Sequence, residues 1–150
     1  MQPPATEPKP EMKDDKYGTA EQIMALAPAR LAAILKDPGA SVYARAKACQ
    51  QLAVNGGASA VPALAALLPD PRLSHYARFG LEPNPDASAG AALRKALGEL
   101  KGPLLVGVIN SIAVRRDGMA IEPLAKLVWS EDAGVARAAN AALARIRPPG

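Results

Sequence analysis

Aromatic residues and cysteine are scarce in this 150-residue sequence: phenylalanine, tryptophan and tyrosine together make up 3% of it, and Cys49 is the only cysteine. One cysteine cannot form a disulfide within the chain, so the sequence does not reveal a redox compartment. No apolar run approaches the ~18–20 residues that a membrane-spanning helix needs. The shortage of aromatic and β-branched residues argues against a β-sandwich or barrel. Hydrophobic residues make up 49% of the chain, and its richness in alanine and leucine is typical of closely packed helices.

The first 18 residues differ in composition from the rest of the chain. Prolines 3, 4, 8 and 10 stand among charged residues, and so few apolar side chains cannot offset the entropy of ordering. The composition predicts a disordered tail over residues 1–18, a helical domain over 19–147 and a short C-terminal end over 148–150. The Gln-Pro-Pro opening fits an exported chain whose leader has been removed, and it fits a cytoplasmic chain equally well. We therefore expect a soluble protein and leave its compartment open.

The chain contains an internal repeat. Residues 29–45 and 62–78 are identical at ten of 17 positions at an offset of 33 residues, and the shared residues include Asp-Pro and Ser-x-Tyr-Ala-Arg. A weaker copy relates residues 60–68 to 120–128 at an offset of 60, which leaves room for one divergent unit between them. The predicted units are about residues 20–55, 57–81, 87–115 and 118–147.

Each unit reads as two helices. Apolar residues recur at helical spacing in the first helix, as in Leu64, Leu67 and Leu68, and mark one buried face. Breakers such as Asp70-Pro71 then separate it from the second helix, where aspartate can cap and proline is tolerated in the first turn. The predicted helices cover residues 20–36, 41–54, 58–68, 72–81, 87–100, 103–115, 119–129 and 133–146.

The last unit resembles a HEAT repeat. The matching residues are Ile121–Val128, the turn residue Asp132 and the apolar positions Val135, Ala139, Ala142, Leu143 and Ile146. One departure is Ala136 after the turn valine, where HEAT units favour arginine; here Arg137 follows one place later. The resemblance covers about residues 20–147. It implies an all-α fold, an α-α superhelix (α-solenoid) of about four HEAT-like helical hairpins, with first helices on the convex face and second helices on the concave face.

HEAT arrays generally bind proteins and sometimes nucleic acid, and some HEAT-like proteins attach bilin chromophores or excise alkylated bases. The resemblance therefore implies a non-catalytic scaffold or adaptor that binds a protein partner on its concave second-helix face. A polyanion or nucleic-acid binding module and a HEAT-like lyase or glycosylase are the alternatives. The net charge of +4 and the few aromatic residues disfavour nucleic acid and fit an acidic protein partner. The sequence does not determine the oligomeric state.

The sequence offers no constellation for catalysis. His75 is the only histidine, and the usual metal sites would need nearly all-carboxylate ligands. Adjacent residues on a helix point about 100° apart, so Ser74 and His75 are not expected to form a nucleophile–base pair. Cys49, in the middle of a predicted helix, is expected to be a small buried hydrophobe. The sequence predicts no catalytic residue, no cofactor and no metal site.

The best indication of a binding surface is the recurrence of Tyr43 and Arg45 as Tyr76 and Arg78 in the next unit. The arginines either bridge loop carboxylates such as Asp37 or Asp70, or line a basic groove with other second-helix arginines. Trp129 lies beside the turn that follows the first helix of the last unit. It either caps the packing there or, if exposed, is a binding hot spot. The candidate partner-binding residues are Arg45, Arg78, His75, Arg115, Arg116, Arg137 and Trp129.

Overall fold

The structure is a computed structural model that describes residues 12–147. The expectations for residues 1–11 of the tail and for the C-terminal end, 148–150, lie outside the described residues. In chain order the elements are β1 (Lys13–Asp14), β2 (Gly18–Thr19), α1 (Ala20–Met24), α2 (Pro28–Lys36), α3 (Val42–Asn55), the 3₁₀ turn η1 (Ala58–Ala60), α4 (Val61–Ala65), α5 (Ser74–Leu81), α6 (Ala87–Leu97), α7 (Gly102–Arg115), the 3₁₀ turn η2 (Gly118–Ala120), α8 (Ile121–Leu127) and α9 (Ala133–Ile146).

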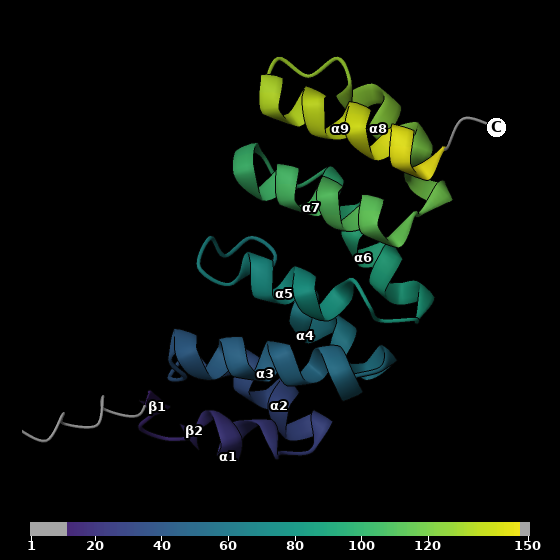
Figure 1. Cartoon of the computed structure of the whole chain (residues 1–150). Helices are drawn as coiled ribbons and strands as arrows, with labels where there is room; N and C mark the ends of the chain where they lie inside the picture. The colour runs from purple at the N-terminus through teal and green to yellow at the C-terminus, as the bar shows by residue number, and fades with distance from the viewer. Residues whose placement is uncertain (1–11, 148–150) are drawn as a thin grey trace, which may run out of the picture.

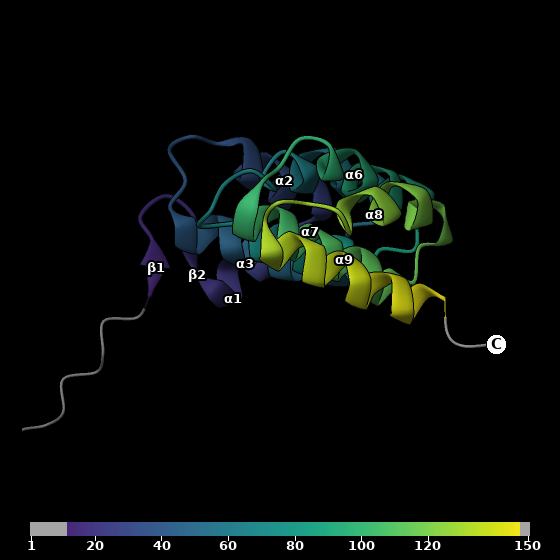
Figure 2. The same cartoon turned by 90° about the horizontal axis from the view of Figure 1, so that it is seen from above.

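The helices pack in sequential pairs, α2 on α3, α4 on α5, α6 on α7 and α8 on α9. Figure 1 shows the pairs stacked one on the next from the N-terminus to the C-terminus, and Figure 2 separates them into two layers. We call α2, α4, α6 and α8 the first-helix layer. The second-helix layer consists of α3, α5, α7 and α9, together with α1, which packs on α3. The prediction of a mostly helical chain of paired helices is thereby confirmed.

The core runs along the stack between the two layers. Each helix of the first-helix layer contributes one leucine without exposed surface. These are Leu31, Leu64, Leu93 and Leu124. Small residues let the helices approach closely: a Cβ added at Gly80 of α5 would lie 2.9 Å from a methyl carbon of Leu64. None of the helices within residues 12–147 combines the length and the apolar character needed to cross a bilayer.

The helix predicted over residues 20–36 is wrong, because the structure has two helices there. α1 ends at Met24 and α2 begins at Pro28. Proline has no N–H and its ring clashes with the carbonyl of the preceding turn, so one helix cannot continue through it. Thr19 and Gln22 start α1 with a capping box, in which each side chain accepts from the other residue's N–H.

Four other helices are shorter than expected: α5 begins at Ser74 instead of residue 72, and α6 ends at Leu97 instead of residue 100. The segments 58–68 and 119–129 each begin with a 3₁₀ turn and continue as α4 and α8, which end at Ala65 and Leu127. Residues 66–69 follow α4 as a series of turns. The final helix, α9, coincides with its predicted range of 133–146.

Residues 12–18, which the composition assigns to a disordered tail, are folded. β1 pairs antiparallel with β2, and Asp14, the last residue of β1, is only 5% exposed. Its carboxylate accepts the N–H groups of Lys16 (2.8 Å), Tyr17 (2.9 Å) and Ser41 (2.8 Å), the last at the N-cap of α3. The hairpin therefore closes the N-terminal end of the stack. Composition missed it because specific contacts of a few residues hold the segment: besides the bonds to Asp14, Asp37 accepts from Nζ of Lys16 (2.9 Å) and from the hydroxyl of Tyr17, whose ring packs on the core.

Asp14 makes this closure sensitive to acid. Burial raises the pKa of Asp14, but the hydrogen bonds that it accepts outweigh this effect and bring the pKa to about 2. Because an unfolded aspartate titrates near pH ~4, the stabilisation is complete above that pH and is lost as the pH falls through about 2. We expect Asp14→Asn to lower the free energy of unfolding by about 1–2 kcal/mol at neutral pH. Below the native pKa the difference should vanish.

Urea denaturation at neutral pH and near the native pKa of Asp14 measures this effect. The exposed neighbour Asp15 provides the control, since Asp15→Asn removes the same charge without these bonds. Equal effects of the two substitutions at neutral pH would contradict the closing role of Asp14.

Candidate partner-binding surface

Arg78 belongs to α5, and its side chain reaches α7. Its guanidinium donates to the carbonyl of Gly107 (3.1 Å) and to Oγ of Ser111 (3.3 Å), and Ser111 in turn donates to Glu82 (2.7 Å). Gly107 makes room for it, because a Cβ there would lie 2.7 Å from Cζ of Arg78. Burial lowers the pKa of Arg78, while the charge of Glu82 acts in the opposite direction. Arg78 is therefore a partly desolvated cation that joins two consecutive helix pairs.

Arg115 fixes the segment that links α5 to α6. One of its terminal nitrogens donates to the carbonyls of Leu81 (3.0 Å), Glu82 (3.1 Å) and Asn84. Asn84 is only 4% exposed, and its side chain donates to the carbonyl of Gly57 (2.9 Å). This linker contains Pro83 and Pro85, which prevent a continuous helix, and Asn84 between them was not among the predicted functional residues. Its amide and Arg115 together hold the linker against the preceding and following units.

The other candidates have different surroundings. Arg45 donates to the carbonyl of Ala40 in the loop just before its own helix (3.0 Å), which is closer to the loop-bridging alternative than to a groove. Arg116, at the left-handed C-cap of α7 (φ 51°), is exposed and donates to the carbonyl of Arg145 (3.2 Å). Arg137 is exposed on α9. Trp129 is 86% exposed but follows α8, in the first-helix layer.

The structure therefore does not bring the seven candidates onto one surface. Four of the five candidate arginines donate to backbone carbonyls of this chain, and Trp129 belongs to the opposite layer from the others. His75 and Arg78 are the two that meet, as described below.

Cys49 and His75 have contrasting environments. Cys49 has no exposed surface, and burial raises the pKa of its thiol to about 12, so a thiolate is strongly disfavoured. This agrees with the expectation of a small buried hydrophobe. His75 is exposed, and its ring centroid lies 3.9 Å from that of Tyr76. In the part of the chain that the structure describes, no three His, Cys, Asp or Glu side chains are grouped to hold a metal ion.

An apolar hollow of about 380 Å³ lies on the second-helix layer, across α1, α3 and α5. Its lining residues are Met24, Gln50, Val54, His75, Tyr76 and Phe79. Val54 is 78% exposed and Phe79 is 56% exposed, so two large apolar side chains face water at its edge. Sequence analysis did not single them out. The repeat itself contained a signal, because Phe79 takes the place of Ala46 of the preceding unit, which is 6% exposed.

A second hollow adjoins the first. This basic hollow, of about 440 Å³, lies between the beginnings of α5 and α7. Its lining residues are Pro71, Ser74, His75, Arg78, Lys101, Pro103 and Leu104. His75 lines both hollows, which places them side by side. The basic hollow joins two of the predicted residues, His75 and Arg78, to Lys101, which the sequence did not single out.

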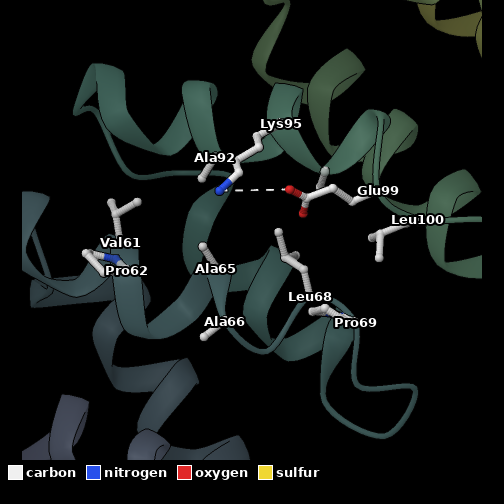
Figure 3. Close-up of a pocket in the computed structure, with 11 residues that line it drawn as sticks. Val61, Pro62, Ala65, Ala66, Leu68, Pro69, Ala92, Lys95, Glu99 and Leu100 are labelled. Atoms are coloured by element: carbon white, nitrogen blue, oxygen red, sulfur yellow. Dashed lines mark ion pairs between the residues drawn. The ribbon is translucent and has the colours of Figure 1, made fainter.

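A third hollow, of about 430 Å³, lies in the first-helix layer between α4 and α6 and is drawn in Figure 3. Alanine, leucine and proline side chains form most of its wall. Its charged side chains are Lys95 and Glu99, whose ion pair spans 3.8 Å one helical turn apart. Both are largely exposed, and a surface pair of this kind contributes at most about 1 kcal/mol. Apart from this exposed ion pair, the side chains of the wall are apolar.

No protein-family model and no curated protein sequence matches this chain. The functional argument therefore depends on the two adjoining hollows of the second-helix layer and on the charges around them.

Proposed function

We propose that this chain is a HEAT-like α-solenoid scaffold that binds an acidic segment of a protein partner on its second-helix layer. The sequential pairing of helices, the two layers and the leucine that recurs in each first helix support the solenoid. In such an array the stacked helices expose one long face, and side chains on it are available to an extended partner.

The observation that carries the proposal is the apolar hollow. Phe79 and Val54 expose more than half of their surface to water, although both side chains are apolar. Exposed apolar groups gathered around a hollow mark interaction sites in soluble proteins, and aromatic residues dominate binding energy at such sites. The hollow is suited to one apolar side chain of the partner, which would displace water from Phe79.

The charges around the two hollows indicate which residues flank the apolar side chain of the partner. None of the residues that line either hollow is acidic, and the basic hollow contributes His75, Arg78 and Lys101. Lys47, one turn before Gln50 on α3, adds another cation and contacts Gln50 at 3.3 Å. Complementary charge steers a partner and fixes its orientation. We therefore infer a partner segment with an apolar anchor flanked by aspartate or glutamate.

The proposed role is non-catalytic. The two hollows share one histidine and contain no carboxylate or thiol, so an acid–base pair or an activated nucleophile is not assembled in them.

Selection from a random peptide library tests the proposal. Selected peptides should share an apolar residue flanked by acidic ones, and fluorescence anisotropy should show about tenfold weaker binding to Phe79→Ser, as expected for loss of an aromatic anchor. Trp129→Ser is the control, because it removes an even more exposed aromatic residue (86% against 56%) from the other layer. Binding that depends on Trp129 and not on Phe79 would overturn the proposed surface.

A further inference from the structure

Two helices begin at the basic hollow. Ser74 and His75 are the first residues of α5, and Lys101 is the N-cap of α7. The first amides of a helix have no acceptor within it, and they carry the positive end of the helix dipole. Neither N-cap residue, Leu73 or Lys101, supplies a side-chain acceptor to these amides. The N–H of Ser74 already donates to the carbonyl of Asp70 (2.8 Å), and Pro103 has no N–H. The backbone donors that remain at the hollow are therefore those of His75 on α5 and of Gly102 and Leu104 on α7.

Unpartnered buried donors provide a second and independent observation. Ser74 is 4% exposed and lines the hollow, yet its hydroxyl has no hydrogen-bond partner among the described residues. Nε of Arg78 is also buried and without a partner among these residues, but it faces Gly107 of α7, where an added Cβ would lie 2.8 Å from it. A buried donor without an acceptor is unfavourable, and such groups are rare in folded proteins. At Ser74, which lines the hollow, the unpartnered hydroxyl indicates a missing acceptor.

The electrostatics favour an anion as that acceptor. Arg78, Lys101 and His75 line the hollow, and none of its lining residues is acidic. The neighbouring carboxylates are already engaged: Asp70 accepts from Arg72, and Glu82 accepts from Ser111. Burial lowers the pKa of Arg78, so an anion beside it would relieve a partly desolvated charge.

We propose that the basic hollow binds a phosphate-type oxyanion carried by a phosphomonoester. A tetrahedral phosphate presents several oxygens in different directions. It can therefore meet the Ser74 hydroxyl, the positive charges of Arg78 and Lys101 and the amides that begin α7 together. A planar carboxylate has two oxygens and would leave more of these donors without acceptors. The volume of about 440 Å³ leaves room for the group esterified to the phosphate. This site does not depend on the apolar hollow or on a protein partner.

Titration of the full chain with phenyl phosphate, followed through backbone amide NMR shifts at constant ionic strength, tests the site. Saturable shifts are expected at the amides of His75, Gly102 and Leu104, which surround the hollow. Sodium chloride at the same ionic strength should not produce them. The absence of a saturable shift, or the same pattern with chloride, would overturn the proposal.

Two substitutions test whether the donors named above form the binding site. Lys101→Ala and Ser74→Ala should each weaken phenyl phosphate binding about tenfold, whereas Lys126→Ala, an exposed lysine of α8, should leave it unchanged. Ser74→Ala should also leave the melting temperature of the free protein unchanged or raise it, because it removes an unpartnered hydroxyl. A clearly lower melting temperature would show that the hydroxyl already has a partner and would contradict the site.

A parallel titration with inorganic phosphate distinguishes the two sources of the anion. Tighter binding of phenyl phosphate supports a phosphomonoester that uses the rest of the hollow. Binding of inorganic phosphate alone would overturn the ester while retaining the oxyanion site. Acetate that binds as tightly as either would refute the preference for a tetrahedral anion.

Discussion

Arg115→Met is expected to lower the free energy of unfolding by about 2–4 kcal/mol, because it leaves buried carbonyl groups of the linker without a donor. Its guanidinium donates to Leu81, Glu82 and Asn84, and methionine preserves much of the aliphatic stem while removing every one of these bonds. Because the linker is also anchored through Asn84 to Gly57, we expect the loss to loosen the contact between the second and third helix pairs.

Arg137→Met is the matched control. Arg137 was predicted to lie in the same basic groove, but it is exposed on α9, and its replacement should change stability by no more than about 0.5 kcal/mol. Urea denaturation of the two variants and the wild type measures the difference. Similar effects of both substitutions would show that the carbonyl contacts of Arg115 are not what holds the linker.

The helix pairs were predictable because each leaves a repeated trace in the sequence. The leucine stripes and the Asp-Pro breakers recur at the repeat length, and they located the paired helices that the structure contains. The break before Pro28 was not predicted because the apolar pattern continues from Ile23 to Leu31, across residues whose backbone is not helical. Hydrophobic periodicity shows which side chains face the core. It does not show where a proline, which lacks an N–H, interrupts the helix.

The destinations of the arginines could not be predicted for a different reason. Arg78 and Arg115 donate mainly to backbone carbonyls contributed by residues 29 to 34 positions away in the chain. Every residue has a carbonyl, so the acceptor leaves no signature in the sequence. The apolar hollow was better marked, because Phe79 replaces a small residue of the preceding unit. Comparison of equivalent positions between units therefore predicts exposed anchors better than it predicts bonding partners.

Gly107→Ala is expected to lower the free energy of unfolding of the wild type but to raise that of a variant in which Arg78 is replaced by alanine. In the wild type the added Cβ would lie 2.7 Å from Cζ and 2.8 Å from Nε of Arg78, so the guanidinium must move away from the Gly107 carbonyl and Ser111. Crowding of this kind costs about 1–3 kcal/mol. In an Arg78→Ala background the space is free, and alanine should instead stabilise the interior of α7 by about 0.5–1 kcal/mol relative to glycine.

A double-mutant cycle by urea denaturation measures this reversal. Gly98→Ala is the control, because a Cβ there would have its nearest neighbour at 3.8 Å and its effect should be the same in both backgrounds. Destabilisation by Gly107→Ala in both backgrounds would show that something other than Arg78 occupies the space. Because Arg78 also lines the basic hollow, Gly107→Ala should weaken phenyl phosphate binding without altering any residue that lines the hollow. That linked loss would connect the joint between α5 and α7 to the anion site.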